Sequence, residues 1–256
     1  MISKEKIKYF NSLKIKKNRL TEKKIIVEGE RLIFEMLKTK IHFDMILISN
    51  NNSMSQMNID IISNANEKNI QIETIDEKII KKLSSTKNNQ SIIGICNFPK
   101  YKKINYSNNI LALDHISDPG NMGTLLRTAE WFGINNIILS NNCVDLFNAK
   151  VIRSGMGAHF YLKSICSLNL SDEIIKLKNK GYSILGADKN GIEISKINSN
   201  NKWVLIIGNE ANGLSKNIIN QLTNIIAIPG TGNIESLNAS VAGGILLNNL
   251  NEKEKQ

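Results

Sequence analysis

Short apolar runs alternate with amphipathic stretches along the first hundred residues of the chain. Residues 30–38, 55–68 and 77–83 have the apolar spacing of helices, strongest in the first of them. Four intervening runs have the length and β-branched content of buried strands. They are KKIIVEG (23–29), DMILIS (44–49), IQIET (70–74) and SIIGICNF (91–98). Strands that alternate with helices predict a small α/β unit, preceded by a basic, partly helical lead-in.

The stretch PKYKKINYSNN (99–109) interrupts this alternation. It is polar and basic and begins with proline, so we interpret it as a linker between a domain at 1–98 and a second domain at 110–256. A new series of strands starts at NILALDH (109–115). Further strands are expected at 136–140, 161–166, 182–187, 203–207 and 224–228, with helices between them and a last helix at 237–250. Short apolar strands with polar flanks are typical of a mainly parallel sheet covered on both faces.

Composition narrows the classes of protein. The 256 residues suffice for one or two domains with ordinary cores. The sequence has no apolar run near the ~18 residues of a membrane helix, and its first residues lack the apolar region of a secretory signal. The three cysteines, Cys96, Cys143 and Cys166, are widely spaced and form no CxxC pair. They argue against a disulfide framework or a zinc site and for a reducing cytoplasm.

The formal net charge of +10 favours a polyanionic partner such as nucleic acid over a merely well-solvated surface. The chain is rich in Ile, Lys and Asn, as under AT-rich codon pressure, so part of the lysine excess carries no functional meaning. Only four of the 33 basic residues are arginines. They are Arg19, Arg31, Arg127 and Arg153, and their scarcity makes each a candidate for chemistry that lysine does not supply.

The first candidate cluster is DHISDPGNMGTLLRTAEWFG (114–133). A strand ends at Asp114, a tight turn follows, and Asn121 can cap the helix that begins there. Arg127 lies less than two turns into this helix. It is therefore expected near the carboxyl ends of the strands, where open α/β sheets bind ligands. The alternative is an ordinary cap and a surface arginine.

Two further clusters combine strand ends with glycine. In WVLIIGNEANGLS (203–215) a buried strand runs into Gly208, Glu210 and Gly213, but Leu214 stands where a phosphate loop needs lysine, so ATP hydrolysis is not indicated. In IIAIPGTGNIESLNASVAGGILL (225–247) a Gly-rich loop leads into a helix of small residues. Glycines allow a ligand to approach the backbone, and free N–H groups at a helix start favour a polar ligand.

These three blocks, in this order, resemble the SpoU (TrmH-like) RNA 2′-O-ribose methyltransferases of the SPOUT superfamily. The chain departs from the family at Gly230, where members commonly have methionine. The segment IIVEGERLIFEML also resembles the family's substrate-binding domain, which is similar to small ribosomal RNA-binding proteins. The matching residues are Asn121 and Arg127 in the first block, Gly208, Glu210 and Gly213 in the second, and Ile228-Pro229 with Ser236-Leu237-Asn238 in the third.

The resemblance implies an α/β catalytic domain with a deep trefoil knot, and S-adenosylmethionine as methyl donor without a metal. It places the donor against Gly208, Ile228 and Leu237, with Gly213 and Asn233 in the same loops. For catalysis it points to Arg127, which we interpret as a phosphate anchor and stabiliser of alkoxide charge, with a deprotonated arginine acting as base left open. Supporting roles fall to Asn121, Glu210, Ser236 and Asn238.

The resemblance also implies a homodimer and an RNA substrate. Ribosomal RNA is favoured over tRNA because the N-terminal domain is ribosomal-protein-like. The alternatives are a non-catalytic RNA-binding protein, a base methyltransferase of the same superfamily, and a small-molecule methyltransferase, which the basic N-terminal domain disfavours. Tyr101 and Tyr106 are candidates for base stacking or plain linker residues, and Trp131 and Trp203 are expected in the core.

Overall fold

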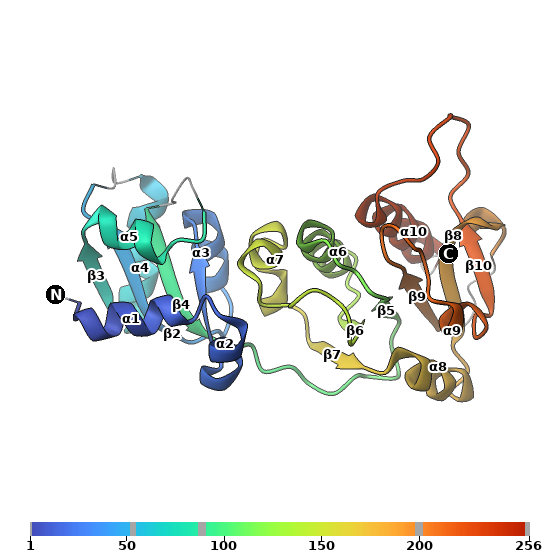
Figure 1. Ribbon diagram of the computed structural model, residues 1–256, viewed down its shortest axis with the longest axis horizontal. Helices are drawn as coiled ribbons and strands as arrows, with labels where there is room; N and C mark the ends of the chain where they lie inside the picture. The colour runs from blue at the N-terminus through green and yellow to red at the C-terminus, as the bar shows by residue number, and fades with distance from the viewer. Residues whose placement is uncertain (1, 52–54, 87–90, 198–201, 254–256) are drawn as a thin grey trace. The chain divides into compact units, whose positions relative to one another are not determined.

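The computed structural model describes residues 2–51, 55–86, 91–197 and 202–253 (Figure 1). The chain divides into two compact units. The first comprises residues 1–100 and 147–161, and the second comprises residues 101–146 and 162–256.

The first unit is built on a four-stranded sheet in the order β1-β4-β2-β3. The strand β4 runs antiparallel to both of its neighbours, whereas β2 and β3 are parallel. All four strands lie close to the ranges expected from the sequence. Their bounds are β1 Lys24–Glu28, β2 Phe43–Ser49, β3 Ile72–Ile75 and β4 Ile92–Asn97.

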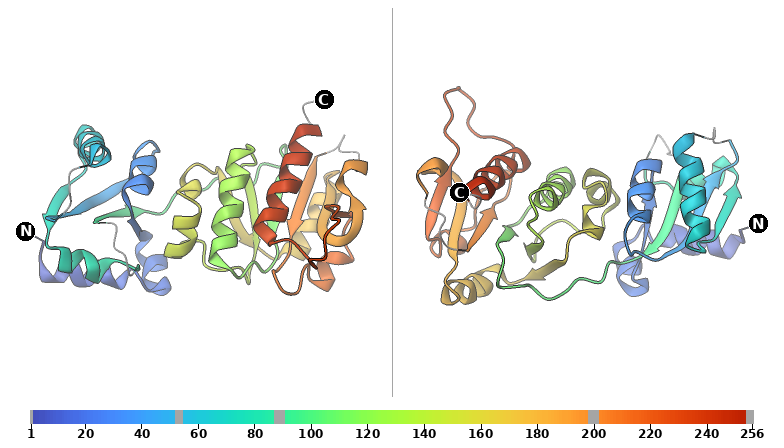
Figure 2. Two further views of the ribbon diagram at one scale, coloured as in Figure 1. Left: turned by 90° about the horizontal axis from the view of Figure 1, so that it is seen from above. Right: turned by 180° about the vertical axis from the view of Figure 1, so that it is seen from behind.

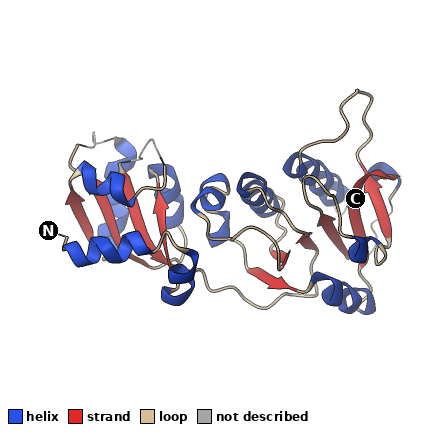
Figure 3. Ribbon diagram, viewed as in Figure 1, coloured by secondary structure: helices blue, strands red, loops and turns tan. Residues whose placement is uncertain are grey.

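Helices cover both faces of this sheet (Figure 3). On one face, Phe10 and Leu13 of the lead-in and Ile80 and Leu83 of α5 share a core with alternate side chains of the strands. On the other face α3 packs against α4. Side chains of Ser3, Ser55 and Asp76 cap α1, α4 and α5. The helices are α1 Lys4–Ser12, α2 Lys16–Glu22, α3 Glu30–Leu37, α4 Gln56–Glu67 and α5 Glu77–Leu83.

A segment from the second half of the chain completes the first unit. Residues 147–161 contain α7 (Ala149–Ser154) and the 3-10 turn η1 (Ala158–Phe160). Phe147 stacks on Phe98 with ring centroids 3.9 Å apart, and Arg153 donates a hydrogen bond of 2.8 Å to Ser85 Oγ. The sequence pattern alone assigns these residues to the second domain, because their partners lie some 50 to 70 positions earlier.

The second unit contains a six-stranded sheet in the order β10-β8-β9-β5-β6-β7, and every neighbouring pair is parallel. The expectation of a mainly parallel sheet is therefore confirmed. The strands are β5 Ile110–Leu113, β6 Asn136–Ser140, β7 Ser164–Leu168, β8 Ser183–Glu193, β9 Trp203–Ile207 and β10 Asn224–Ala227.

Helices α8 and α9 close one face of the parallel sheet around a core that includes Leu170, Ile174 and Ile218. On the other face α6 and α10 lie side by side (Figure 2). Their close approach depends on Gly243, since a Cβ there would lie 2.4 Å from Leu125 Cδ2. The helices are α6 Pro119–Trp131, α8 Leu170–Asn179, α9 Lys216–Ile219 and α10 Ala239–Lys253, with a 3-10 turn η2 at Ile194–Lys196. Across the described residues, no helix has the length and apolar content needed to cross a membrane.

The two tryptophans differ from each other in burial. Trp203 begins β9 and is 1% exposed, so its expected place in the core is confirmed. The same expectation is wrong for Trp131, which is 84% exposed. Trp131 follows Thr124 by seven residues and Arg127 by four, so it continues the exposed stripe of α6. The trefoil knot implied by the resemblance stays a prediction.

Candidate functional site

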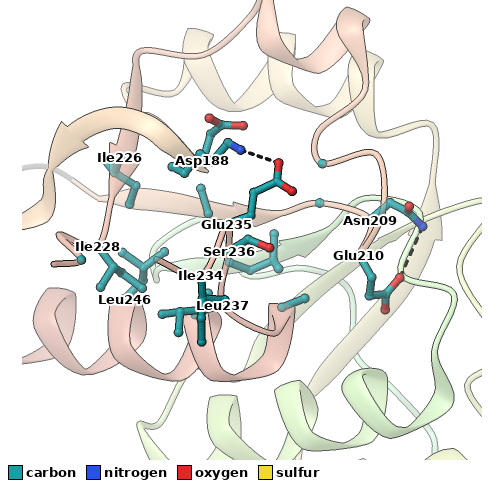
Figure 4. Close-up of a pocket in the computed structure, with 18 of the residues that line it drawn as sticks. Asp188, Asn209, Glu210, Ile226, Ile228, Ile234, Glu235, Ser236, Leu237 and Leu246 are labelled. Carbon is teal, nitrogen blue, oxygen red and sulfur yellow. Dashed lines mark hydrogen bonds and ion pairs between the residues drawn. The ribbon is translucent and has the colours of Figure 1, made fainter. Parts of the chain in front are cut away.

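A cavity of about 700 Å³ lies where β8, β9 and β10 end (Figure 4). Because neighbouring strands are parallel, the loops that follow them meet at one edge of the sheet, here called the carboxyl edge. The lining is rich in glycine and branched apolar residues and holds few charges. It includes Gly208, Gly213, Gly230 and Gly232, the apolar Ile207, Ile226, Ile228, Leu237 and Leu246, and the charged Asp188, Lys189, Glu210 and Glu235.

An irregularity in β8 brings two of these charges to the cavity. Ile225 of β10 pairs with Gly186, but the next residue, Ile226, pairs with Ile192, so residues 187–191 leave the ladder. Asp188 and Lys189 lie in this excursion and line the cavity. Lys189 Nζ lies 2.7 Å from Glu235 Oε1 in the loop after β10. Sequence reasoning missed both residues, although their position directly after the expected strand 182–187 was a signal.

The loop after β9 depends on a glycine. A Cβ at Gly208 would lie 2.4 Å from the carbonyl carbon of Gly213, which is backbone and cannot move aside cheaply. Asn209 and Gly213 exchange two backbone hydrogen bonds of 2.9 Å, and Gly213 has a φ of 65°. Residues 208–213 therefore form a closed loop whose backbone borders the cavity.

Glu210 fastens this loop to the start of α6. One carboxylate oxygen accepts hydrogen bonds from Ser117 N and Oγ at 3.3 and 3.0 Å. The other accepts from Asp118 N at 3.2 Å and from Asn121 Nδ2 at 3.0 Å. Partial burial by itself would raise the pKa of Glu210, but the hydrogen bonds from Asn121, Ser117 and the backbone outweigh it and hold the pKa below its ordinary value. Glu210 is therefore ionised and fully occupied as an acceptor.

Asn121 joins the three sequence blocks. It is not the helix cap that the sequence suggested: Asp118 Oδ1 caps α6 by accepting from Asn121 N at 2.8 Å. The buried Asn121 side chain donates to Glu210 and accepts a 2.9 Å hydrogen bond from Asn238 Nδ2. Asn238 Oδ1 in turn accepts from Ser240 N at 2.9 Å at the start of α10. The chain Glu210–Asn121–Asn238 thus links the loops that border the cavity.

The remaining predicted residues divide into two groups. Ile228, Ser236 and Leu237 line the cavity. Arg127 and Asn233 are exposed and do not contribute to its lining. In the part of the chain that the structure describes, Arg127 has no hydrogen-bond or ion-pair partner within its unit, so its guanidinium is available to a ligand.

The lining fits the methyl donor expected from the sequence. Branched apolar side chains suit a flat purine, and the glycines at 208, 230 and 232 expose backbone groups to a closely held ligand. No side-chain atom lies within 4 Å of where a Cβ would stand on Gly230 or Gly232. Three carboxylates face one ammonium around the cavity, so a cationic sulfonium and an ammonium group are favoured there.

Two family models match the chain. The model of the SpoU rRNA Methylase family matches residues 108–248, and that of the MRM3-like substrate binding domain matches residues 4–94. Together they cover most of both units, with residues 95–107 between the two matches.

Curated relatives and solved structures agree with the family models. The chain is 30% identical over 247 residues, 96% of each chain, to the 23S rRNA (guanosine(2553)-2′-O)-methyltransferase RlmP of Bacillus subtilis. An rRNA methyltransferase from Sinorhizobium meliloti superposes with a TM-score of 0.82 at 25% identity, covering 98% of this chain and 96% of that one. The SpoU methyltransferase AviRb of Streptomyces viridochromogenes, solved with AdoMet, has a TM-score of 0.83 at 18% identity over 99% of both chains and shares the fold.

Proposed function

We propose, from the premise that this chain belongs to the SpoU rRNA methylase family, that it methylates a ribose 2′-hydroxyl of ribosomal RNA. It is an S-adenosylmethionine-dependent RNA methyltransferase. The observation that carries the proposal is the meeting of Glu210, Asn121 and Asn238, one from each sequence block, beside a glycine-rich cavity at the carboxyl edge.

The reaction needs alignment of a hydroxyl and removal of its proton. S-adenosylmethionine, when bound, supplies an electrophilic methyl group on a cationic sulfur. Glu210 is not the base, because its carboxylate is saturated with hydrogen bonds and its pKa is lowered. It holds the cavity loop in place, and Asn121 and Asn238 extend the same support to α10.

Arg127 anchors the RNA and stabilises the developing alkoxide. A guanidinium has a pKa above ~12, so it favours a phosphate or an oxyanion rather than taking up a proton. With Arg127 charged throughout, the 2′-hydroxyl proton passes to solvent water as the bond from oxygen to the methyl group forms and the bond from sulfur to the methyl group breaks. The alternative is a deprotonated Arg127 that takes up this proton itself.

The protein acts as a homodimer through the exposed sides of α6 and α10. These neighbouring helices present Trp131, Val241 and Ile245 to solvent, at 84%, 50% and 36% exposure. A second copy of the chain would remove this apolar surface from water. Arg127 lies four residues before Trp131, so such a dimer places the guanidinium at the interface and gives it access to a partner's cavity.

The first unit selects the RNA. Lys14 Nζ donates a 2.7 Å hydrogen bond to Lys82 O, which brings together two lysine clusters that are distant in the sequence. Lys14, Lys16 and Lys17 and the α5 residues Lys81 and Lys82 are exposed. They form a basic surface suited to RNA phosphates, on the unit that matches a substrate-binding domain.

The substrate is 23S ribosomal RNA in the cytoplasm, by analogy with the Bacillus relative, which is named for methylation of guanosine 2553. A ribose-methylation map of total RNA, from cells with and without the protein, tests this. A 2′-O-methyl group protects the adjacent phosphodiester from alkali, so the modified position is read directly as a missing cleavage.

A single protected position in 23S RNA that depends on the protein is the expected result. Protection in tRNA alone would show that the substrate is tRNA and not ribosomal RNA. Methyl incorporation that leaves every phosphodiester alkali-labile would point to a base methyltransferase, and RNA binding without donor binding to a non-catalytic protein.

A further inference from the structure

The edge of the parallel sheet opposite the cavity carries a group of lysines. At this amino edge the chain enters its strands, and the second unit exposes six ammonium groups there or on the adjoining end of α8. We call this group the strand-entry face. It consists of Lys102, Lys103, Lys163, Lys176, Lys180 and Lys202.

The segment 101–109 is fixed along this edge, between β4 and β5 in Figure 1. Lys102 N donates to Lys163 O at 2.9 Å, and Ser164 Oγ donates to Lys103 O at 3.0 Å. Asn105 N donates to Asn136 Oδ1 at 3.0 Å, at the first residue of β6. The backbone that bears Lys102, Lys103 and Lys163 is therefore ordered, while the lysine side chains remain exposed.

Aromatic rings position the lysines at the other end of the face. Lys180 Nζ lies 4.8 Å from the centroid of the Tyr106 ring, and Lys202 Nζ lies 5.0 Å from that of Tyr182. The Tyr106 hydroxyl donates to Glu173 at 2.5 Å, which together with burial raises its pKa to about 12. The hydroxyl of Tyr106 thus bonds Glu173 and its ring faces Lys180, so the ring is not open for stacking on an RNA base.

Acidic residues do not neutralise this face. The buried Glu173 is shared between Tyr106 and Lys176, Asp172 acts on Lys176, and Glu130 acts on Lys163. Of the six lysines, Lys176 alone forms an ion pair within the described part of the second unit. Lys202 Nζ also donates a 3.0 Å hydrogen bond to Tyr106 O, which leaves its charge in place. Six ammonium groups against these three carboxylates leave an excess of three positive charges, whereas the cavity at the other edge has three carboxylates and one lysine.

We propose that the strand-entry face binds the phosphate backbone of the substrate RNA, outside the nucleotide that is methylated; this rests on the proposed function. From β9 through β5 and β6 to β7 there are three strand spacings, or about 14 Å. A nucleic acid duplex presents several phosphates over that length. The five-residue strands separate the face from the cavity by about 17 Å, so the RNA bound here flanks the target.

Lysine contacts to phosphates position an RNA without reading its sequence. The face therefore adds affinity and orientation, and it leaves the choice of nucleotide to other surfaces. Its contribution must depend on salt, since each phosphate contact releases counterions.

The test compares two triple variants of the full-length protein with equal loss of charge. The face variant carries Lys102→Gln, Lys103→Gln and Lys163→Gln. The control carries Lys178→Gln, Lys196→Gln and Lys216→Gln, which remove exposed lysines that are not part of this face. Lys178 points to the other side of α8 from Lys176 and Lys180. The probe is protein-free 23S rRNA transcribed in vitro, bound at several salt concentrations, and donor affinity is measured by calorimetry.

For the face variant we expect binding to 23S rRNA to weaken roughly tenfold at low salt and the slope of log Kd against log salt to fall by about 2 to 3. The control should keep the wild-type slope to within about 1, and both should bind S-adenosylmethionine normally. Equal slopes for the two variants would overturn the proposal, as would a wild-type protein that binds the rRNA without salt dependence. If binding behaves as expected but no 2′-O-methylation occurs, the proposed function fails and the RNA-binding face stands.

Discussion

The two edges of the parallel sheet in the second unit differ in which of their groups are held in place. At the carboxyl edge, side chains are tied to one another: Glu210 accepts from three residues of the α6 start, and Asn121 links it to Asn238. At the amino edge, the backbone is fixed but the lysine heads project into solvent.

The difference follows from the ligands. A small cationic donor needs atoms held at set positions, and the carboxyl edge supplies glycine backbone and ionised carboxylates for it. An RNA phosphate chain offers many equivalent anions, so exposed ammonium groups suit it without a single fixed geometry. A single substitution at the carboxyl edge should therefore cause a large loss of activity or of donor affinity. Each substitution at the amino edge should weaken RNA binding by a small, salt-dependent amount.

The largest effect is expected at Arg127, because the other three arginines of the chain all belong to the first unit. Arg127→Ala should lower the rate of methyl transfer by about 100- to 1000-fold, as the loss of a transition-state donor does. Donor affinity should not change, because Arg127 is outside the cavity lining. Arg127→Lys should lose most of the rate as well, since an ammonium does not reproduce the planar fork. Full activity of the lysine variant would show that charge alone suffices.

Gly208→Ala should act next most strongly, through the donor. Its Cβ would press on the backbone of Gly213, at a cost of roughly 1 to 3 kcal/mol, or about 5- to 150-fold in S-adenosylmethionine affinity. Gly244→Ala in α10 is the matched control, because Gly244 is outside the cavity lining and a Cβ there would lie 3.7 Å from Thr128 Cγ2, an ordinary van der Waals contact. Calorimetric titration of both variants checks the prediction, and equal affinities would show that the loop yields.

Glu210→Gln should reduce the free energy of unfolding by about 1 kcal/mol at neutral pH, a modest value because water screens this largely exposed carboxylate. The folded-state pKa of Glu210 lies below 4.5, so the ionised form contributes stability above that value and loses it as the pH falls through the folded pKa. Denaturant unfolding across pH should show wild type and variant converging in acid. A difference that grows on acidification would contradict the assigned sign.

The smallest effect is expected from Lys163→Gln alone. One lost phosphate contact should weaken RNA binding about two- to fourfold at low salt and lower the salt slope by about 0.7 to 0.9. Melting temperature and donor affinity should match wild type, since Lys163 is exposed and makes no side-chain bond within the described second unit. Filter binding at three salt concentrations suffices, and a lost melting transition would mean that the amino edge is structural.

The sequence anticipated the carboxyl edge better than the amino edge. Gly208, Glu210 and Asn121 stood out because strand ends, glycines and polar residues coincide there. Asp188 and Lys189 were missed because the register shift between β8 and β10 is a property of strand pairing across some 35 residues. The strand-entry face was invisible because lysine is abundant throughout the chain, and only the fold places Lys163 beside Lys102. Trp131 shows the same limit, since an apolar residue alone does not indicate which side of its helix packs against the rest of the protein.

The chain passes between the units three times, because residues 147–161, between β6 and β7, pack with the first unit. The first unit is consequently not formed by one continuous segment of the chain. Cutting the chain at residue 98 would leave Phe147, Val151 and Ile152 without the surface that buries them. An engineer who grafts the first unit onto another protein must transplant residues 147–161 as well. The same constraint acts in evolution, where recombination at a single linker would yield a protein with an uncovered apolar helix.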